Sequence, residues 1–223
     1  MKGVFITGTN TNVGKTWVGT QLIKALVRKN IRVKPIKPVE SGWVDKEVEK
    51  TDAWKLATAT GREFDLDKVC PNHFKAPISP ERAAKKEGVR LSLDTIIDDC
   101  ISDARSHDFH FIEGAGGFYS PLCADGLNAD LAKALNLPII LVAEDTLGCI
   151  NQVLLNVEAI ENRGLKLVAI VLNQQKEYEN KLMDNKQDLK NRLNYPVLPV
   201  HYNKVNNNNF DVLCDFLLSS YAG

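Results

Sequence analysis

The chain has 223 residues, of which 44% are hydrophobic and 25% are charged, and its 28 basic and 28 acidic residues give a formal net charge of zero. This composition is typical of a globular protein with a large core, and the length favours a single domain over residues 1–223. The balanced charge argues against a nucleic-acid-binding protein, because such proteins normally carry a basic excess on the binding face.

Nothing in the sequence predicts a membrane or disulfide-bonded protein. The opening MKGVFITGTN lacks the long apolar segment of a signal peptide, and no apolar run approaches the roughly 20 residues that span a bilayer. The 5 cysteines are widely spaced, which is typical of reduced thiols, and the 4 histidines are too scattered for a zinc site. We therefore expect a cytoplasmic protein.

Short β-rich runs alternate with amphipathic stretches along the chain. In order, we predict a strand at 3–7, a helix at 16–29, a strand at 31–38, a short helix at 53–59, a helix at 91–104, strands at 107–114 and 137–144, a helix at 148–164, a strand at 165–173, a polar helix, the segment YPVLPVH and a helix near 210–221. This pattern predicts an α/β fold with a doubly wound, mostly parallel sheet flanked by helices. The charged stretch 44–50 lacks periodicity and is predicted to be mobile.

The stretch GTNTNVGKT at 8–16 lies between a predicted strand and a predicted helix. It has the order of a phosphate-binding loop, with one residue more than the usual spacing before Gly-Lys-Thr. Backbone N–H groups of residues 12–16 would face phosphate oxygens, Lys15 would lie between the β- and γ-phosphates, and the hydroxyl of Thr16 would bind Mg²⁺. The alternative is a glycine-containing turn with a solvated lysine.

Two further segments carry candidate polar residues. In KPIKPVESG, prolines on both sides hold Lys37 in extended backbone, so its side chain has a fixed direction rather than a loose one. The alternatives are that Lys37 is an exposed lysine at a sheet edge and that Ser41 belongs to a plain turn. In EKTDAWKLA, Asp52 is a candidate Mg²⁺ ligand, although Thr51 or Asp52 would also serve as a helix N-cap.

The segment HFIEGAGGFYSP places an acidic residue directly after a buried strand and before glycines. Glu113 is therefore in the position of a Walker-B-type carboxylate and would complete a hard-oxygen Mg²⁺ site with Thr16, whereas the alternative is a surface acid beside a turn. Burying an unpaired carboxylate at a strand end would cost several kcal/mol. This cost favours a functional role for Glu113 over an incidental acid beside a turn. Together these segments predict phosphoryl transfer from a nucleoside triphosphate.

The segments GTNTNVGKT, KPVESG, TDAWKLA, EGAGG, LGCIN and VLN occur in the order found in one family, so that the chain resembles the dethiobiotin synthetases over essentially its whole length. The resemblance implies a P-loop NTPase-like fold and an ATP- and Mg²⁺-dependent ring closure of 7,8-diaminononanoate with CO₂. One amine forms a carbamate, ATP converts the carbamate to a mixed anhydride with phosphate, and the second amine attacks to give dethiobiotin, ADP and phosphate.

The resemblance also implies roles for individual residues. Lys15 and Lys37 would be catalytic, and the Mg²⁺ ligands would be Thr16, Asp52 and Glu113. The other residues implied to bind ATP are Asn12, Val13, Gly14, Trp17, Gly114, Ala115, Gly116, Asn173, Gln174 and Pro199. Among these, Asn173 would read the adenine. The residues implied to bind the diamine are Thr11, Ser41, Gly148, Cys149, Ile150 and Asn151.

Members of this family are homodimers, and the resemblance implies that the segment LGCIN lies near the neighbouring subunit's substrate. The carboxylate tail of the substrate would then meet the helix N-terminus that begins near Gly148. Many relatives carry Asp and Glu at the positions of Asn10 and Asn12, so a role for a glutamate at position 12 does not transfer.

Two other classes share the loop. A nucleotide-switch partitioning ATPase usually has a second lysine early in the loop, where this chain has Asn10, and often has a basic surface. A glutamine-dependent amidotransferase needs an added domain with a nucleophilic cysteine, and 223 residues leave no room for one.

Overall fold

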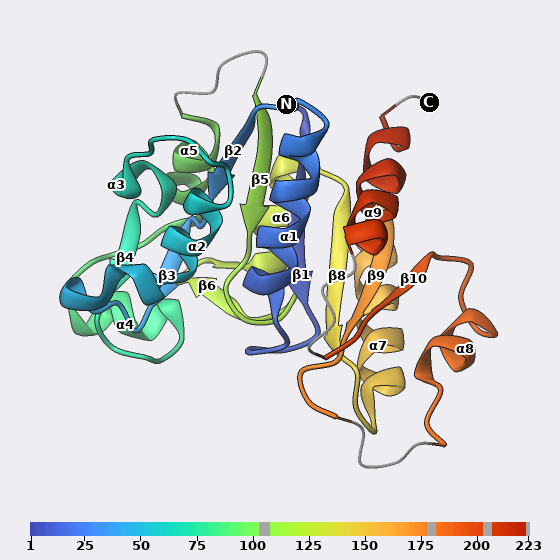
Figure 1. Ribbon diagram of the computed structural model, residues 1–223. Coiled ribbons are helices and arrows are strands. Elements are labelled where there is room, and N and C mark those ends of the chain that lie inside the picture. Colours follow the sequence, from blue (N-terminus) through green and yellow to red (C-terminus); the bar gives the residue numbers. More distant parts are fainter. Residues whose placement is uncertain (103–107, 178–181, 203–206, 222–223) are drawn as a thin grey trace.

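The computed structural model describes residues 1–102, 108–177, 182–202 and 207–221 (Figure 1). In chain order the elements are β1 (Gly3–Gly8), α1 (Lys15–Arg28), β2 (Val33–Ile36), β3 (Val39–Ser41), the 3₁₀ helix η1 (Asp45–Lys50), α2 (Asp52–Thr58), α3 (Leu66–Val69), β4 (Asn72–Phe74), α4 (Pro80–Lys86), α5 (Leu93–Ile101), β5 (Phe109–Glu113), β6 (Pro121–Cys123), β7 (Gly126–Leu127), α6 (Asn128–Leu135), β8 (Ile139–Glu144), α7 (Cys149–Asn162), β9 (Leu167–Asn173), α8 (Asn185–Lys190), β10 (Val197–Val200) and α9 (Asn207–Ser219).

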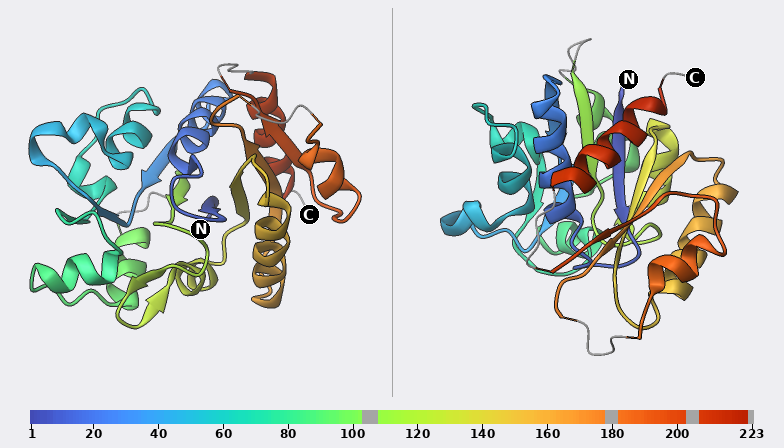
Figure 2. Two further views of the ribbon diagram at one scale, coloured as in Figure 1. Left: turned by 90° about the horizontal axis from the view of Figure 1, so that it is seen from below. Right: turned by 45° about the vertical axis from the view of Figure 1, so that its right-hand side comes forward.

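A parallel sheet of six strands in the order β10-β9-β8-β1-β5-β2 forms the centre of the molecule. Its strands are apolar along most of their length because both faces are covered. Helices α1 and α9 lie on one face, and α5, α6 and α7 lie on the other (Figures 1 and 2). This confirms the predicted α/β fold with a parallel sheet between helices.

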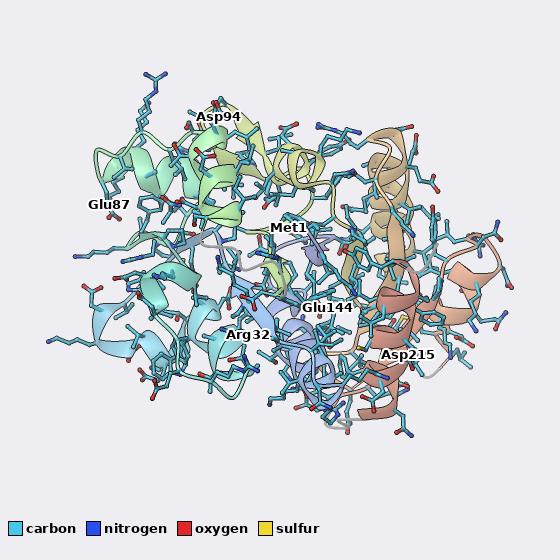
Figure 3. The ribbon with its side chains drawn as sticks, turned by 90° about the horizontal axis from the view of Figure 1, so that it is seen from above. Met1, Arg32, Glu87, Asp94, Glu144 and Asp215 are labelled. Atoms are coloured by element: carbon cyan, nitrogen blue, oxygen red, sulfur yellow. The ribbon has the colours of Figure 1, made fainter. Side chains whose placement is uncertain are left out.

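Alternate residues of β1 point into two separate cores. Val4 and Ile6 pack with residues of α1 and α9, whereas Phe5 packs with residues of α5, α6 and α7. Figure 3, seen from above, shows the same division, with Asp94 of α5 and Asp215 of α9 on opposite sides of Met1.

The register of the sheet decides which loops meet. Ile6 of β1 pairs with Glu113 of β5, and Ile36 of β2 pairs with Ile112 of β5. The next residue after Ile36 is Lys37, so Lys37 and Glu113 leave the sheet side by side. Because the strands are parallel, the loops after β1, β2 and β5 emerge at the same edge, which is where ligands bind in open α/β sheets.

Several predicted bounds differ from the observed ones. The predicted strand 31–38 stops at Ile36, and Val39–Ser41 pairs instead with β4 in a small separate sheet. Pro35 is tolerated because β2 is an edge strand of the main sheet, where its missing N–H breaks no ladder. The short elements α3, α4, β4, β6, β7 and α6 were not predicted.

The helix predictions are correct in place. Ser92 caps α5, since its hydroxyl accepts a hydrogen bond from the N–H of Thr95, but the helix ends at Ile101, and the predicted end at residue 104 lies outside the described residues. Stretch 44–50 contains η1, which is irregular at Glu47, where φ is −137°; its mobility and the single-domain organisation remain predictions.

All five cysteines are buried and free, as expected for reduced thiols. Among the described residues, no helix combines the length and apolar character needed to cross a membrane.

Candidate active site

The loop between β1 and α1 has the backbone of an anion-binding nest. Asn12 and Gly14 both have positive φ, 60° and 91°, and Gly14 is the N-cap from which α1 begins at Lys15. Alternation of left- and right-handed backbone turns successive N–H groups toward a common point, where a phosphate can sit at the helix N-terminus. The side chain of Lys15 is buried, and its ammonium donates to the carbonyl oxygen of Asn10 at 3.0 Å.

Two amide side chains at the end of β9 hold this loop from behind. Asn173 Nδ2 donates to the carbonyl oxygen of Val13 at 2.9 Å, and Gln175 Nε2 donates to that of Asn12 at 2.6 Å. Because these carbonyls are tied toward the end of β9, the N–H groups of residues 12–16 are left for a phosphate. Gln175 was not predicted, because a hydrogen bond to backbone 163 residues away leaves no spacing pattern.

Opposite the loop, one ammonium lies between two carboxylates. Nζ of Lys37 is 2.6 Å from Oε1 of Glu113 and 2.9 Å from Oδ2 of Asp52. The hydroxyl of Thr16 donates to the same Oε1 of Glu113 at 2.7 Å. Glu113 is 0% exposed, and its Oε2 has no hydrogen-bond partner among the described residues. The structure therefore brings together four of the five residues predicted for the catalytic and metal chemistry, and the fifth, Lys15, lines the same cavity.

Helix α2 brings Asp52 to this cluster. Thr51 is the N-cap, since its hydroxyl accepts from the N–H of Trp54 at 3.1 Å, so the carboxylate of Asp52 is left for Lys37. The buried carboxylate of Glu40 accepts from the N–H groups of Asp52 at 2.7 Å and Ala53 at 3.0 Å. Glu40 was not predicted, although an acidic residue is well suited to the positive end of a helix.

Burial and mutual charge set the protonation of the cluster. Burial alone would lower the pKa of Lys37, but the charges of Asp52, Glu113 and Glu40 outweigh it and raise that pKa, so the side chain remains an ammonium. Burial acts to raise the pKa of Asp52, and the nearby Lys37 lowers it below its usual value. Burial raises the pKa of Glu113, an effect that Lys37 opposes.

Lys15 is different, because it has no carboxylate within contact distance among the described residues. Its pKa falls from 10.5 to about 8, mainly because the side chain is buried and also because Lys37 is positively charged, while the charges of Glu113 and Asp52 oppose the shift. The phosphate loop thus has a cation that is short of a counter-charge, which an incoming phosphate would supply.

The loop after β5 lies across from the phosphate loop. Asn128, fully buried at the start of α6, accepts from the N–H of Ala115 at 2.9 Å and donates to its carbonyl at 2.6 Å. Gly116, at φ 81°, lines the cavity beside Thr11, whereas Gly114 and Ala115 lie behind it. Asn128 was missed because its partner lies 13 residues earlier in another element.

A cavity of about 820 Å³ joins these groups and continues between α1 and α2. Its lining residues are Thr11, Asn12, Gly14, Lys15, Thr16, Trp17, Thr20, Lys24, Lys37, Glu49, Asp52, Trp54, Lys55, Thr58, Ala59, Gly116 and Gln175.

Some predicted residues lie away from this cavity. Asn173 is buried beneath the phosphate loop, the side chain of Gln174 accepts from the N–H of Tyr202 at 3.3 Å, and the carbonyl of Pro199 accepts from Asn209 at 2.8 Å. Ser41 ends β3 and is half-buried. The stretch 148–151 forms the N-terminus of α7, where Gly148 is the N-cap and Leu147 before it is 90% exposed.

The oxygen ligands available here suit Mg²⁺. Thr16, Asp52 and Glu113 offer one hydroxyl and two carboxylates, and Oε2 of Glu113 has a free acceptor. Within the described part of the chain, no group of three or more His, Cys, Asp and Glu side chains forms a metal site. Mg²⁺ is usually held by one or two carboxylates together with substrate phosphates and water.

The fold is shared with solved structures that are distant in sequence. The MinC:MinD cell division protein complex of Aquifex aeolicus matches with a TM-score of 0.58 and 12% identity, covering 100% of this chain and 97% of that one. Cobyrinic acid a,c-diamide synthase of Mycobacterium smegmatis, solved with ADP and magnesium, matches with a TM-score of 0.55 and 15% identity, covering 100% of this chain and 96% of that one.

Similarity in sequence is more specific. A family model described as an AAA domain matches residues 2–201. The ATP-dependent dethiobiotin synthetase of Anaeromyxobacter dehalogenans is 42% identical over 173 residues, covering 78% of this chain and 77% of that protein. The enzyme of the same name from Vesicomyosocius okutanii is 41% identical over 176 residues, covering 78% of this chain and 79% of that protein. The chain therefore belongs to the ATP-dependent dethiobiotin synthetase family.

Proposed function

We propose that the protein closes the ureido ring of dethiobiotin from 7,8-diaminononanoate, CO₂ and ATP, releasing ADP and phosphate. The observation that carries the proposal is the cluster in which Lys37 lies between Asp52 and Glu113 across the cavity from the phosphate loop. The family relationship supplies the substrates. This arrangement serves phosphoryl transfer, which depends on positioning and on electrostatic stabilisation more than on covalent catalysis.

The reaction has three steps. The nitrogen of one amine bonds to the carbon of CO₂ and loses a proton, which gives a carbamate. A carbamate oxygen then attacks the γ-phosphorus of ATP, and the bond to the β,γ-bridging oxygen breaks, which releases ADP. Finally, the second amine attacks the carbamoyl carbon, the carbon–oxygen bond to phosphate breaks, and the nitrogen loses a proton.

Residues of this site can bind the phosphates and stabilise the negative charge that these steps involve. Lys15 and the loop N–H groups bind the polyphosphate, and Lys15 regains a counter-charge when they do. Lys37 contributes its positive charge to the carbamate and to the transferring phosphoryl group, where negative charge accumulates. Thr11, beside Gly116 in the same cavity, is within the region where the diamine would meet the γ-phosphate.

We further propose that Mg²⁺ is the metal and that Thr16, Asp52 and Glu113 hold it directly or through water. When bound, the ion would neutralise charge on the phosphates. These carboxylates would serve both the ion and the ammonium of Lys37, which lies against the two of them.

The carboxylate tail of the diamine is proposed to bind a second copy of the chain. Residues 148–151 do not line the cavity of their own chain, and the N-terminus of α7 has no side-chain cap. Leu147 is exposed beside it. A homodimer in which the helix N-terminus of one subunit faces the cavity of the other would supply an anion site for the tail.

We place this ATP-dependent reaction in the cytoplasm.

The test is incubation of the protein with ATP, Mg²⁺, bicarbonate and 7,8-diaminononanoate. We expect ADP release and a ureido product in equal amounts, and neither without the diamine. ADP release that does not depend on the diamine would contradict the synthetase and favour a switch ATPase.

A further inference from the structure

Trp17 is the third residue of α1, directly after the predicted metal ligand Thr16, and it is 37% exposed. The exposed part of its ring is available at the site, because Trp17 lines the same cavity as Lys15 and Thr16. The phosphate chemistry uses nothing of the indole ring. Its position therefore points to a role for a different part of the ligand.

The indole is held in place from the other side. The ring of Phe210, at the start of α9, meets Trp17 with a centroid distance of 5.7 Å and an interplanar angle of 67°. Phe210 is 2% exposed and belongs to the core between α1 and α9. This edge-to-face contact fixes the tryptophan, so ordering the ring costs little when a ligand binds it.

The direction of the cavity gives the class of ligand. Its anion-binding end is fixed by the loop N–H groups, Lys15 and Lys37, and from there it follows α1 past Trp17 and Thr20 to Lys24. A nucleotide with its terminal phosphate near Lys37 can extend its nucleoside from there along the first turns of α1. The first large flat surface in that direction is Trp17.

We infer that the exposed part of Trp17 is the platform on which the base of the bound nucleotide stacks. The inference rests on the proposed ATP binding and adds a residue that selects a nucleoside over a bare polyphosphate. Because every base has a π-face, such a platform strengthens binding without choosing among bases.

The residue predicted to read adenine has another task in this structure. The Nδ2 of Asn173 is bound to the carbonyl of Val13, and the side chain is 5% exposed. This hydrogen bond uses the amide nitrogen of Asn173 to support the loop, and its contact with adenine stays a prediction; the indole would add a stacking surface on the cavity side.

The experiment is isothermal titration of Mg-ADP and of Mg-pyrophosphate, which is the same diphosphate without a nucleoside. The variants are Trp17→Ala, Trp17→Phe and, as a matched control, Trp54→Ala, which removes the other tryptophan that lines the cavity. Stacking of one base on an aromatic side chain corresponds to a roughly 5- to 150-fold change in affinity.

We expect W17A to weaken ADP by that factor while pyrophosphate binding is unchanged, W17F to keep most of the affinity, and W54A to change neither. An equal loss for both ligands would show damage to the phosphate loop and overturn the inference. An unchanged ADP affinity in W17A, or an ADP-specific loss in W54A, would overturn it too.

The two proposals fail separately. If W17A loses ADP selectively but the wild-type protein forms no ureido product, the base platform stands and the proposed reaction falls. If the product forms but W17A binds ADP normally, the proposed reaction stands and the base platform falls. If the wild-type protein does not bind ADP, both are wrong.

Discussion

Nζ of Lys37 lies 2.6 Å from Oε1 of Glu113, and both side chains are almost completely buried. A buried carboxylate without a cation is costly, so in the nucleotide-free protein this lysine provides the counter-charge that the metal would provide during catalysis. The same ammonium thus has a structural task before the substrates bind and a chemical task afterwards.

Removing Lys37 is expected to reduce both stability and turnover. In Lys37→Met the carboxylate of Glu113 loses its cation, which should lower the free energy of unfolding by about 3–5 kcal/mol. The loss of one electrostatic stabiliser should lower kcat by roughly 100- to 1000-fold. Urea unfolding and steady-state kinetics measure the two effects.

Lys24→Met is the matched control, because Lys24 lines the same cavity but is exposed. It should change stability by no more than about 0.5 kcal/mol. If K37M keeps a near-normal kcat, Lys37 has been assigned the wrong role.

Glu113→Gln should weaken the dependence of nucleotide binding on Mg²⁺. The amide keeps the shape of the side chain but offers the ion no negative charge, so the Mg²⁺ concentration for half-maximal ADP binding should rise by about tenfold or more. Titration of Mg²⁺ at fixed ADP measures this.

Glu40→Gln separates metal binding from support of the fold. Glu40 accepts two N–H groups at the start of α2, so E40Q should lower the melting temperature and leave the Mg²⁺ requirement close to that of the wild type. Equal shifts of the Mg²⁺ requirement in both variants would contradict a direct role for Glu113.

Nucleotide binding should take up a proton in alkaline solution. The pKa of Lys15 in the free protein is about 8, so at pH 9.5 the side chain is mostly neutral and binding of phosphate should recharge it. Titrations of ADP in buffers with different ionisation enthalpies should show uptake of about one proton at pH 9.5 and little at pH 7. Lys15→Arg, which stays charged, should abolish the difference.

The same shift has a consequence for stability in the absence of nucleotide. The pKa of Lys15 in the folded protein lies below its ordinary value of 10.5, so the unfolded chain binds more protons between about pH 8 and 10.5. The contribution of Lys15 therefore destabilises the fold fully below pH 8, and this penalty disappears as the pH rises through that window. Comparison of unfolding curves for the wild type and K15R isolates the contribution.

Gly14→Ala should abolish nucleotide binding. The residue has φ 91°, and a Cβ there would overlap Nδ2 of Asn173, which holds the carbonyl of Val13. Gly88→Ala, at φ 74° with open space around it, carries the backbone strain without a collision and should cost about 1–2 kcal/mol. G14A should unfold more easily than G88A. A G14A variant that binds ADP normally would contradict the role of the hydrogen bond from Asn173 to Val13 in holding the phosphate loop.

The sequence was sufficient for the main features of the fold because they depend on local pattern. Apolar strands separated by helical stretches give the layers, and the loop motif shows where β1 ends. The small sheet of β3 and β4 could not be foreseen, since each strand has three residues and pairs with a distant segment. The predicted strand 31–38 ran past Ile36 for the same reason, because the sequence does not show that Val39–Ser41 pairs with β4 instead.

The site divides in the same way. Sequence motifs with a known chemistry contain Lys15, Lys37, Asp52 and Glu113, so these residues could be recognised from the sequence. The structure brings them together. Glu40, Asn128 and Gln175 act through hydrogen bonds to the backbone of other segments. Any polar residue could do this in a suitable place, so only the packed structure identifies them.

The clamp of Asn173 and Gln175 on the phosphate loop also bears on the kinetics of binding. These two hydrogen bonds hold the loop in its anion-binding shape from within the protein, so a nucleotide does not have to fold it on binding. Association should then be governed by diffusion into the groove and be similar for different nucleotides. Differences in affinity between them should be expressed in how long each remains bound.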